Sequence, residues 1–225
     1  MKRFTLLACA GLFTAAMAGP SLAADIARPA YKAPVYVAPF SWSGFYVGIN
    51  GGYGWGTAKL SNSIASQSFD TTGGLAGGTI GYNLQTGNWV WGIEGDIDAS
   101  WIKGDTTSGP LCAGGVGCTV KNNWLATVRG RIGYAFDRWL PYFTGGGAFG
   151  DVKTTVPTGL STTSTQAGWT VGGGLEWAFI GNWSAKAEYL YVDLGDADCA
   201  VATCGIDTKV NMKENLFRLG VNYRF

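Results

Sequence analysis

The stretch that decides the fold is FRLGVNYRF, residues 217–225, at the end of the chain. Apolar residues occupy every second position, and arginine, glycine or asparagine stands at the positions between them. Because successive side chains of a β-strand point to opposite faces, this period of two predicts a strand with one apolar and one polar face. The apolar face consists of Phe217, Leu219, Val221, Tyr223 and Phe225.

The same alternation recurs upstream in segments of roughly ten residues, as in strands that cross a membrane. The predicted strands are residues 44–56, 73–85, 89–102, 122–136, 139–151, 167–179, 183–194 and 212–225. Tight connections at 86–88, 137–138 and 180–182 alternate with a polar stretch containing 59–72 and long loops at 103–121, 152–166 and 195–211. The sequence therefore predicts an all-β fold: an eight-stranded antiparallel up-and-down transmembrane β-barrel with three short periplasmic turns and four long extracellular loops.

Charges on the polar faces distinguish a membrane barrel from a soluble one such as a lipocalin. Five acidic residues match five basic ones, as a confined interior requires because an unpaired buried charge costs several kcal/mol. The predicted lumen network is Glu94, Asp96, Asp98, Glu176, Glu188, Arg129, Arg131, Lys186, Arg218 and Arg224. We expect Asp96 and Asp98 to pair with Arg129 and Arg131 on the neighbouring strand. An eight-stranded barrel has room only for side chains, so this lumen is predicted to be plugged.

Aromatic residues stand at the ends of the apolar faces, where the girdles of membrane barrels meet the two interfaces. The predicted girdle residues are Trp89, Trp101, Trp124, Phe136, Trp169, Phe179, Trp183 and Phe225. This placement favours apolar faces that point outward into lipid.

The composition excludes several classes of function. The chain has 225 residues, enough for one domain, and its 36 glycines would weaken helices. With 16 basic and 15 acidic residues it cannot build a basic surface for nucleic acid. It has no histidine, which removes Ser–His hydrolases and histidine metal sites, so we expect neither an enzyme nor a cofactor.

The first residues predict export. Lys2 and Arg3 precede an apolar stretch and a small-residue cleavage site, so residues 1–23 are predicted to be a signal peptide rather than an uncleaved membrane helix. Residues 24–43 contain evenly spaced prolines and are predicted to be an Ala/Pro-rich periplasmic linker. The barrel is then expected to occupy residues 44–225.

The remaining candidate sites have simple structural explanations. Four cysteines of an exported chain predict disulfides within two loops, Cys112 with Cys118 and Cys199 with Cys204, and their spacing does not match a zinc site. Residues 145–150 match a G-x-G-x-x-G pattern inside a strand, without a following helix to hold a phosphate. The aspartates at 193, 196 and 198 are expected to form a solvated acidic loop rather than a calcium site.

Four motifs carry a resemblance to a known family. They are Trp42–Gly48, Gly92–Asp96, Arg129–Tyr134 and Tyr223–Phe225. With them the chain resembles the outer-membrane immunogenic proteins, small porin-family barrels related in architecture to the OmpA transmembrane domain. The resemblance implies location in the bacterial outer membrane, a contribution to envelope integrity and exposure of the loops at the cell surface. It does not by itself establish a pore.

These observations leave three functional hypotheses. The first is a structural barrel with a plugged lumen that displays its loops. The second is a narrow diffusion pore for ions or small hydrophilic solutes, and the third is binding of a ligand or host receptor by the loops. The expected partners are outer-membrane lipids and lipopolysaccharide, with the barrel-assembly machinery and periplasmic chaperones during biogenesis, and the expected state is a monomer or weak oligomer.

The alternating last strand is also the expected assembly signal, because a strand edge can be captured by strand addition before the barrel closes. Deletion of Phe225 is therefore predicted to lower the amount of folded barrel in outer membranes, measured by heat-dependent mobility on gels. Normal heat-modifiable folding of the deletion variant would contradict this role.

Overall fold

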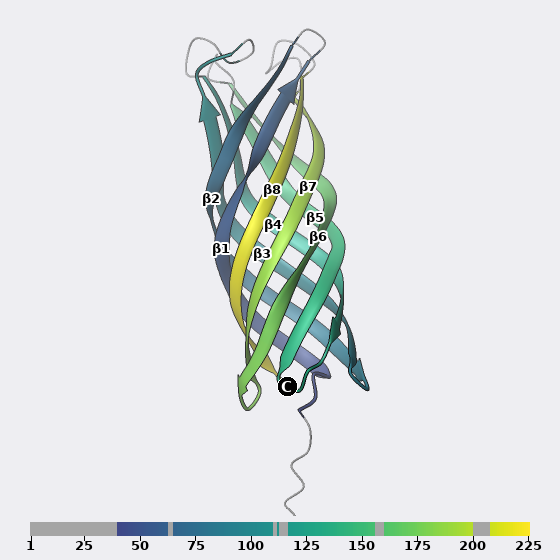
Figure 1. Cartoon of the computed structure of the whole chain (residues 1–225). Helices are drawn as coiled ribbons and strands as arrows, with labels where there is room; N and C mark the ends of the chain where they lie inside the picture. The colour runs from purple at the N-terminus through teal and green to yellow at the C-terminus, as the bar shows by residue number, and fades with distance from the viewer. Residues whose placement is uncertain (1–39, 63–64, 110–111, 113–116, 156–159, 200–207) are drawn as a thin grey trace, which may run out of the picture. The chain divides into compact units, whose positions relative to one another are not determined.

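The structure, a computed structural model, describes residues 40–62, 65–109, 112, 117–155, 160–199 and 208–225. Every regular element in these residues is a β-strand. The strands are β1 Gly44–Ser61, β2 Ser66–Thr86, β3 Trp89–Thr106, β4 Cys118–Tyr134, β5 Trp139–Thr155, β6 Ser161–Ile180, β7 Trp183–Cys199 and β8 Thr208–Arg224. Each pairs antiparallel with its neighbours in sequence, and β8 pairs with β1 to close the barrel (Figure 1).

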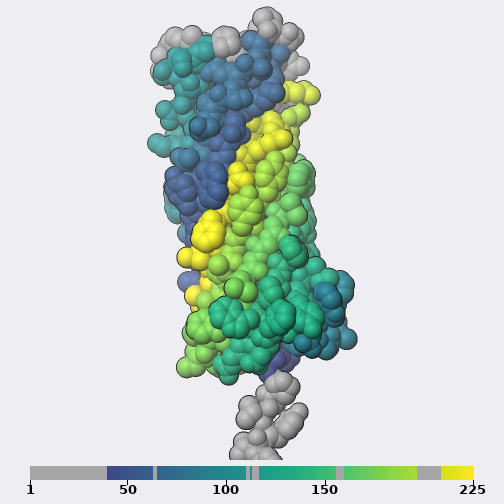
Figure 2. All heavy atoms as spheres, viewed as in Figure 1, coloured from purple at the N-terminus to yellow at the C-terminus, as the bar shows by residue number. Residues whose placement is uncertain are grey.

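The predicted fold class is confirmed. β8, in yellow, runs diagonally between β1 and β7, as the strong tilt of a barrel wall requires (Figure 2). The short connections between β2 and β3, β4 and β5, and β6 and β7 lie at the end of the barrel that also carries the C-terminus (Figure 1). We call this the turn end and the opposite end the loop end. Gly87 and Gly181 adopt positive φ angles of 61° and 50° in two of these turns, a conformation that glycine adopts without strain. No helix in the described part of the chain is long and apolar enough to cross a membrane.

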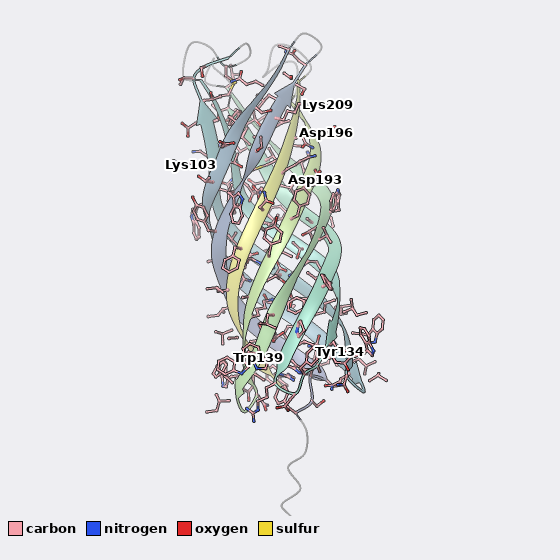
Figure 3. All side chains as sticks on the ribbon, in the orientation of Figure 1. Lys103, Tyr134, Trp139, Asp193, Asp196 and Lys209 are labelled. Atoms are coloured by element: carbon pink, nitrogen blue, oxygen red, sulfur yellow. A yellow bond between two sulfur atoms is a disulfide. The ribbon has the colours of Figure 1, made fainter. Side chains whose placement is uncertain are left out.

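The outer wall of the turn-end half is apolar. Phe143, Ile49 and Ile93 are 76%, 72% and 68% exposed there, which is compatible with lipid rather than with water. Aromatic rings border this apolar wall on both sides. Those at the turn end include Trp89, Tyr134, Trp139, Trp177, Trp183 and Tyr223, and those toward the loop end include Trp55, Trp101, Trp169, Tyr189 and Tyr191. Figure 3 labels Tyr134 and Trp139 at the turn end.

Beyond the second girdle the pattern of the wall inverts. On β1 the outward residues after Trp55 are Thr57, Lys59 and Ser61, whereas the inward Ala58 and Leu60 are buried. The same change occurs on most of the other strands, β6 excepted, so the loop-end half has a polar outside and a largely apolar inside. That arrangement is the one a soluble barrel adopts.

Strand length explains the inversion. Strands of 17 to 21 residues are longer than the 9–11 residues that a tilted membrane strand needs. At a rise of about 3.3 Å per residue and a tilt of about 45°, a strand of this length spans roughly 40 Å, against an apolar band of about 25 Å. The loop-end half therefore projects beyond the membrane, where its outer face meets water.

The predicted loop boundaries were wrong for this reason. β2 begins at Ser66 rather than 73, and β8 begins at Thr208 rather than 212, while the predicted turn-end boundaries agree closely with the structure. Polar outward residues in the projecting half have the composition of loops, so they were assigned to loops. Cys118, Asp196 and Asp198 lie in strands rather than in loops as a result.

The inversion predicts unequal effects for substitutions at two adjacent residues of β3. Ile102 is 1% exposed inside the loop-end half, so Ile102→Ala should lower the free energy of unfolding by about 2–5 kcal/mol. Lys103→Ala, on the outer face, should change it by less than about 0.5 kcal/mol. Denaturant unfolding of the protein in detergent, followed by tryptophan fluorescence, measures both. Equal effects of the two substitutions would contradict an apolar interior at this level.

Candidate functional site

The interior of the turn-end half holds a dense set of ion pairs. Arg129, on β4, is the first centre of this set. Its guanidinium lies 2.5 Å from Glu94 Oε1, 2.7 Å from Asp96 Oδ2 and 2.9 Å from Glu188 Oε2, and its Nε donates to Thr127. The side chain is fully buried. Its fork of donors thus joins two carboxylates of β3 to one on β7 across the lumen.

Arg218, on β8, is the second centre. Its Nη1 lies 2.8 Å from Asp96 Oδ1 and 2.7 Å from Asp98 Oδ2, and its Nη2 lies 2.6 Å from Glu188 Oε1. Arg129 and Arg218 therefore share Asp96 and Glu188. The shared carboxylates combine the two arginines into a single network with fully buried side chains.

A third set lies around Arg131 and Glu94. The Arg131 guanidinium lies 2.8 Å from Glu176 Oε2 and stacks over the ring of Tyr142 at 4.0 Å. Tyr46 Oη donates to Glu94 Oε2 at 2.8 Å, and Lys186 Nζ lies 3.0 Å from the same carboxylate. Glu94 is thereby the junction between this set and Arg129.

The structure differs from the expected pairing in two places. Asp98 pairs with Arg218 across the lumen, not with Arg131 on the neighbouring strand. Arg224 has no carboxylate partner among the described residues, and donates instead to the backbone carbonyl of Ser41. The other nine residues of the predicted lumen network lie together in the interior.

Residues 40–42 close the turn end. Trp42 is completely buried, its backbone N–H donates to Gln85 Oε1 at 2.7 Å, and its indole N–H donates to the carbonyl of Asp137 at 3.0 Å. Arg224 lies over the rings of Phe40 and Trp42 at 4.6 and 4.7 Å. We call Phe40–Trp42 the cork. These three residues precede β1, and they pack into the mouth of the barrel.

The interior of the loop-end half is an apolar layer. Its members are Ala58, Leu60, Phe69, Leu75, Ile102, Val120, Leu125, Ala148, Val152, Leu190, Val192, Leu194, Val210, Met212 and Leu216, together with Cys112 and Cys118. The sulfurs of these two cysteines form a disulfide, as predicted. The disulfide is buried in the apolar layer and is not an exposed cross-link on the surface. Cys204 lies outside the described residues, so the second predicted pair stays a prediction.

Glu214 is a buried carboxyl that the sequence analysis missed. It is 0% exposed, and neither of its oxygens has a hydrogen-bond partner. Its neighbours on β8, Met212 and Leu216, belong to the apolar layer. An ion without a partner in such a place costs several kcal/mol, which favours the neutral acid. Glu214 stands four positions before Arg218 on β8, so both side chains face the interior. This spacing is the sequence signal that could have identified it.

Tyr46, Tyr142 and Trp42 were also missed. The two tyrosines stand at inward positions of β1 and β5, so parity alone would have placed them beside the charges. Trp42 precedes the first strand and carries no periodic signal. Gly145–Gly150 lies inside β5, as expected. In the described residues no three potential ligands form a metal site, and Asp193 instead lies 3.5 Å from Lys213 Nζ.

The fold and its exterior define the class of the molecule. A closed barrel with an apolar, aromatic-bordered outer band and a polar interior at the same level is a transmembrane β-barrel of the bacterial outer-membrane type. The family model for the outer membrane protein beta-barrel domain matches residues 5–225.

The chain belongs to this family of outer-membrane β-barrel proteins, and the predicted resemblance is confirmed by its relatives. It is 40% identical to the 31 kDa outer-membrane immunogenic protein of Brucella melitensis, over 100% of both chains. It is 34% identical to the 25 kDa outer-membrane immunogenic protein of the same organism, over 88% of this chain and 86% of that one. The structure of OprG from Pseudomonas aeruginosa is similar with a TM-score of 0.49 at 15% identity, over 81% of this chain and 96% of that one. The protein is an integral protein of the outer membrane, so the loop end is extracellular and the turn end periplasmic.

Replacing each of two buried glutamates by glutamine should affect stability differently. Glu188→Gln removes the shared partner of Arg129 and Arg218 and should lower the free energy of unfolding by about 3–5 kcal/mol. Glu214→Gln removes no observed partner and should leave it unchanged or raise it. Both changes conserve side-chain size, and denaturant unfolding in detergent compares them. A loss for Glu214→Gln as large as that for Glu188→Gln would show that Glu214 has a partner.

Proposed function

We propose that this protein is a structural, non-catalytic outer-membrane barrel whose lumen is closed, and which contributes to envelope integrity and presents its extracellular loops. The observation that carries the proposal is the ion-pair network around Arg129 and Arg218. Its side chains are buried and reach from β3 and β4 to β7 and β8, so they occupy the cross-section of the lumen.

Two further layers support closure, one on each side of the network. The cork packs Trp42 into the periplasmic mouth, against Val90, Ala135, Leu140 and Ala178. The apolar layer fills most of the extracellular half, with buried polar side chains such as Thr71, Asn122 and Glu214 among its apolar ones. An ion would therefore have to pass aromatic, charged and apolar obstacles in series. This favours the closed barrel over a narrow diffusion pore.

The projecting half supports the part of the proposal that concerns display. Its strands end roughly 15 Å above the apolar band, by the strand lengths given above. Its apolar interior gives the ends of these strands a base that does not depend on lipid. Binding of a ligand or receptor by the loops stays a prediction, because no described residue there forms a recognisable site.

The assembly signal is part of the same proposal. Phe217, Leu219, Val221 and Tyr223 on β8 face outward, Phe225 directly after the strand is exposed, and β8 closes the barrel by pairing with β1. We expect the barrel-assembly machinery to capture this strand before it meets β1, after periplasmic chaperones have delivered the chain.

Planar-bilayer conductance tests the closed lumen. Protein isolated from outer membranes is predicted to give no steady open channels, because three layers must rearrange together before an ion can pass. Trp42→Ala should also give none, since the network and the apolar layer remain. A known porin prepared in the same detergent is the positive control.

Steady channels from the unaltered protein, with a conductance that changes in an Arg129→Ala or Arg218→Ala variant, would overturn the proposal in favour of a pore. Lys103→Ala, on the outer wall, is the matched control. It removes a positive charge without touching the lumen.

A further inference from the structure

The hydrogen-bonded wall of the barrel has a break in the projecting half. β6 pairs with β7 only as far as Trp169, which lies opposite Asp193. Both strands continue beyond this pair, since β6 begins at Ser161 and β7 ends at Cys199, but no ladder joins residues 161–168 to residues 194–199. On their other sides β6 stays paired with β5, and β7 with β8. Two strand edges are therefore left without backbone hydrogen bonds to each other.

A bulge on β7 produces this break. The register of β7 with β8 shifts between Asp193 and Asp196, and Gly195 between them has a positive φ of 69°. The N–H of Gly195 donates to Asp193 Oδ1 at 2.9 Å, and its carbonyl accepts from Asn211 Nδ2 at 2.9 Å. Side chains of β7 and β8 thus take both of its backbone groups. Because a bulge bends the strand that carries it, β7 leaves the line of β6 at this point.

A similar break between β2 and β3 is bridged by other contacts. These two strands are not paired beyond Thr72 and Lys103. Above that pair, however, Gln67 on β2 donates to the carbonyl of Ser108. The backbones also stay close, since a side chain at position 104 would collide with a carbonyl of β2. The edge of β2 is therefore covered where its ladder ends.

The edge of β6 is open to solvent instead. Its inward residues Thr162, Ser164 and Gln166 are half-buried, whereas the inward Val152 and Thr154 of the neighbouring β5 are both 2% exposed. Gln166 Nε2 donates to Ser164 Oγ at 2.7 Å on the same strand, so this bond does not span the break. A solvent-exposed edge offers its unpaired N–H and C=O groups to any extended chain that reaches it.

The sequence of this edge does nothing to prevent such pairing. Natural sheets protect free edges with charged residues, proline or bulges. β7 has two of these devices, the bulge and the exposed Asp196. Residues 161–166 of β6 have the sequence STTSTQ, without charge, proline or glycine, and half of them are threonines, which favour strands. The two sides of the break are therefore unequal, and β6 is the side that can accept another strand.

We propose that residues 161–166 of β6 are a docking site for an extended segment of an extracellular protein, which adds to the free edge as a further strand. Strand addition takes its affinity from main-chain hydrogen bonds and its selectivity from alternate side chains. One face of the added strand would meet the apolar layer at Leu194, and the other would meet water beside Asp196. A segment that alternates apolar residues with basic or hydroxyl residues fits both faces. The site is an edge of the projecting half, so it does not depend on whether the lumen is closed.

A second copy of the barrel does not fit this edge. Two copies in one membrane that are related by a two-fold axis have this axis along the membrane normal. Such an axis turns a strand tilted by about 45° in one direction into a strand tilted by about 45° in the other. The β6 edges of the two copies would therefore cross instead of pairing. An extended segment of another protein is free of this constraint.

Proline substitutions test whether the edge is free. Neighbouring residues of a paired strand direct their N–H groups to opposite sides, so one of Ser164 and Thr165 donates toward β5 and the other points to the break. Proline is tolerated in a sheet where the missing N–H would face solvent. One of Ser164→Pro and Thr165→Pro should therefore fold normally and the other should lose stability. Lys59→Pro and Leu60→Pro, on a strand paired on both sides, should both lose it.

Heat-dependent mobility and denaturant unfolding of the full chain in detergent compare the four variants. Loss of stability in both β6 variants would overturn the proposal, because it would show that the edge is already paired, whether by β7 or by the chain's own connection 200–207.

A labelled peptide tests docking itself, by fluorescence anisotropy with the full chain isolated from outer membranes in detergent. The probe is an eight-residue peptide in which valine alternates with lysine and threonine. In the control peptide prolines replace the valines, which keeps the charge and removes donors. The probe should bind at least about tenfold more tightly than the control peptide, because several main-chain hydrogen bonds distinguish the two.

The matched variants place the peptide on the edge. The β6 proline variant that folds normally should bind the probe about fivefold more weakly or worse, since it lacks one donor of the ladder. Alanine at the same position keeps this donor and should change binding by less than about twofold. No saturable binding of the probe, equal binding of the two peptides, or equal binding by the proline and alanine variants would each overturn the site. Channels in the bilayer experiment would contradict the closed lumen and leave this site unaffected.

Discussion

A charge that leaves water inside this barrel requires an opposite charge, because an unpaired buried ion costs several kcal/mol. Arg129 and Arg218 meet this requirement together by sharing Asp96 and Glu188. The members of the network come from strands on different sides of the lumen, so they meet only when the barrel closes in the right register. Register in turn depends on the network. A slip of one residue on β7 would turn Glu188 toward lipid and leave two arginines without their shared partner.

The same requirement explains why the wall inverts where it leaves the membrane. Inside the apolar band the outer face must be apolar, so polar residues are confined to the lumen and must satisfy one another. Above Trp55 the outer face meets water and headgroups, and the lumen no longer has to hold the polar residues. Leu60 and Ile102 can then fill it. Each half has the arrangement that its surroundings favour, and continuous strands join the two. Glu214 lies on the border between the two halves. It has no hydrogen-bond partner, so it belongs neither to the ion-pair network nor to the apolar layer.

Periodicity predicted the strands and their periplasmic ends because aromatic residues such as Trp139 and Trp183 mark those ends in the sequence. It failed at the extracellular ends, where Thr57, Lys59 and Ser61 look like a loop when their inward neighbours are ignored. Parity also predicted which charges enter the lumen. It could not predict that Asp98 meets Arg218, because contacts across a lumen depend on the stagger of the closed barrel and not on neighbouring strands. The cork was beyond reach for a different reason, since a segment as short as Phe40–Trp42 has no period.

The three layers of the interior differ in what would open them. Water that enters the apolar layer would find few partners, and water that enters the network would have to replace ion pairs between buried groups. The cork is held by hydrogen bonds to Gln85 and Asp137. A single change of conditions therefore does not loosen all of them, because salt and pH act on ion pairs while apolar packing responds to neither in the same way. In such a barrel, residues on the outside can be substituted most freely because they belong to none of the three layers. The loops, the outer wall of the projecting half and the girdles are the surfaces that the protein presents to its surroundings, and under the proposed function its biology resides there.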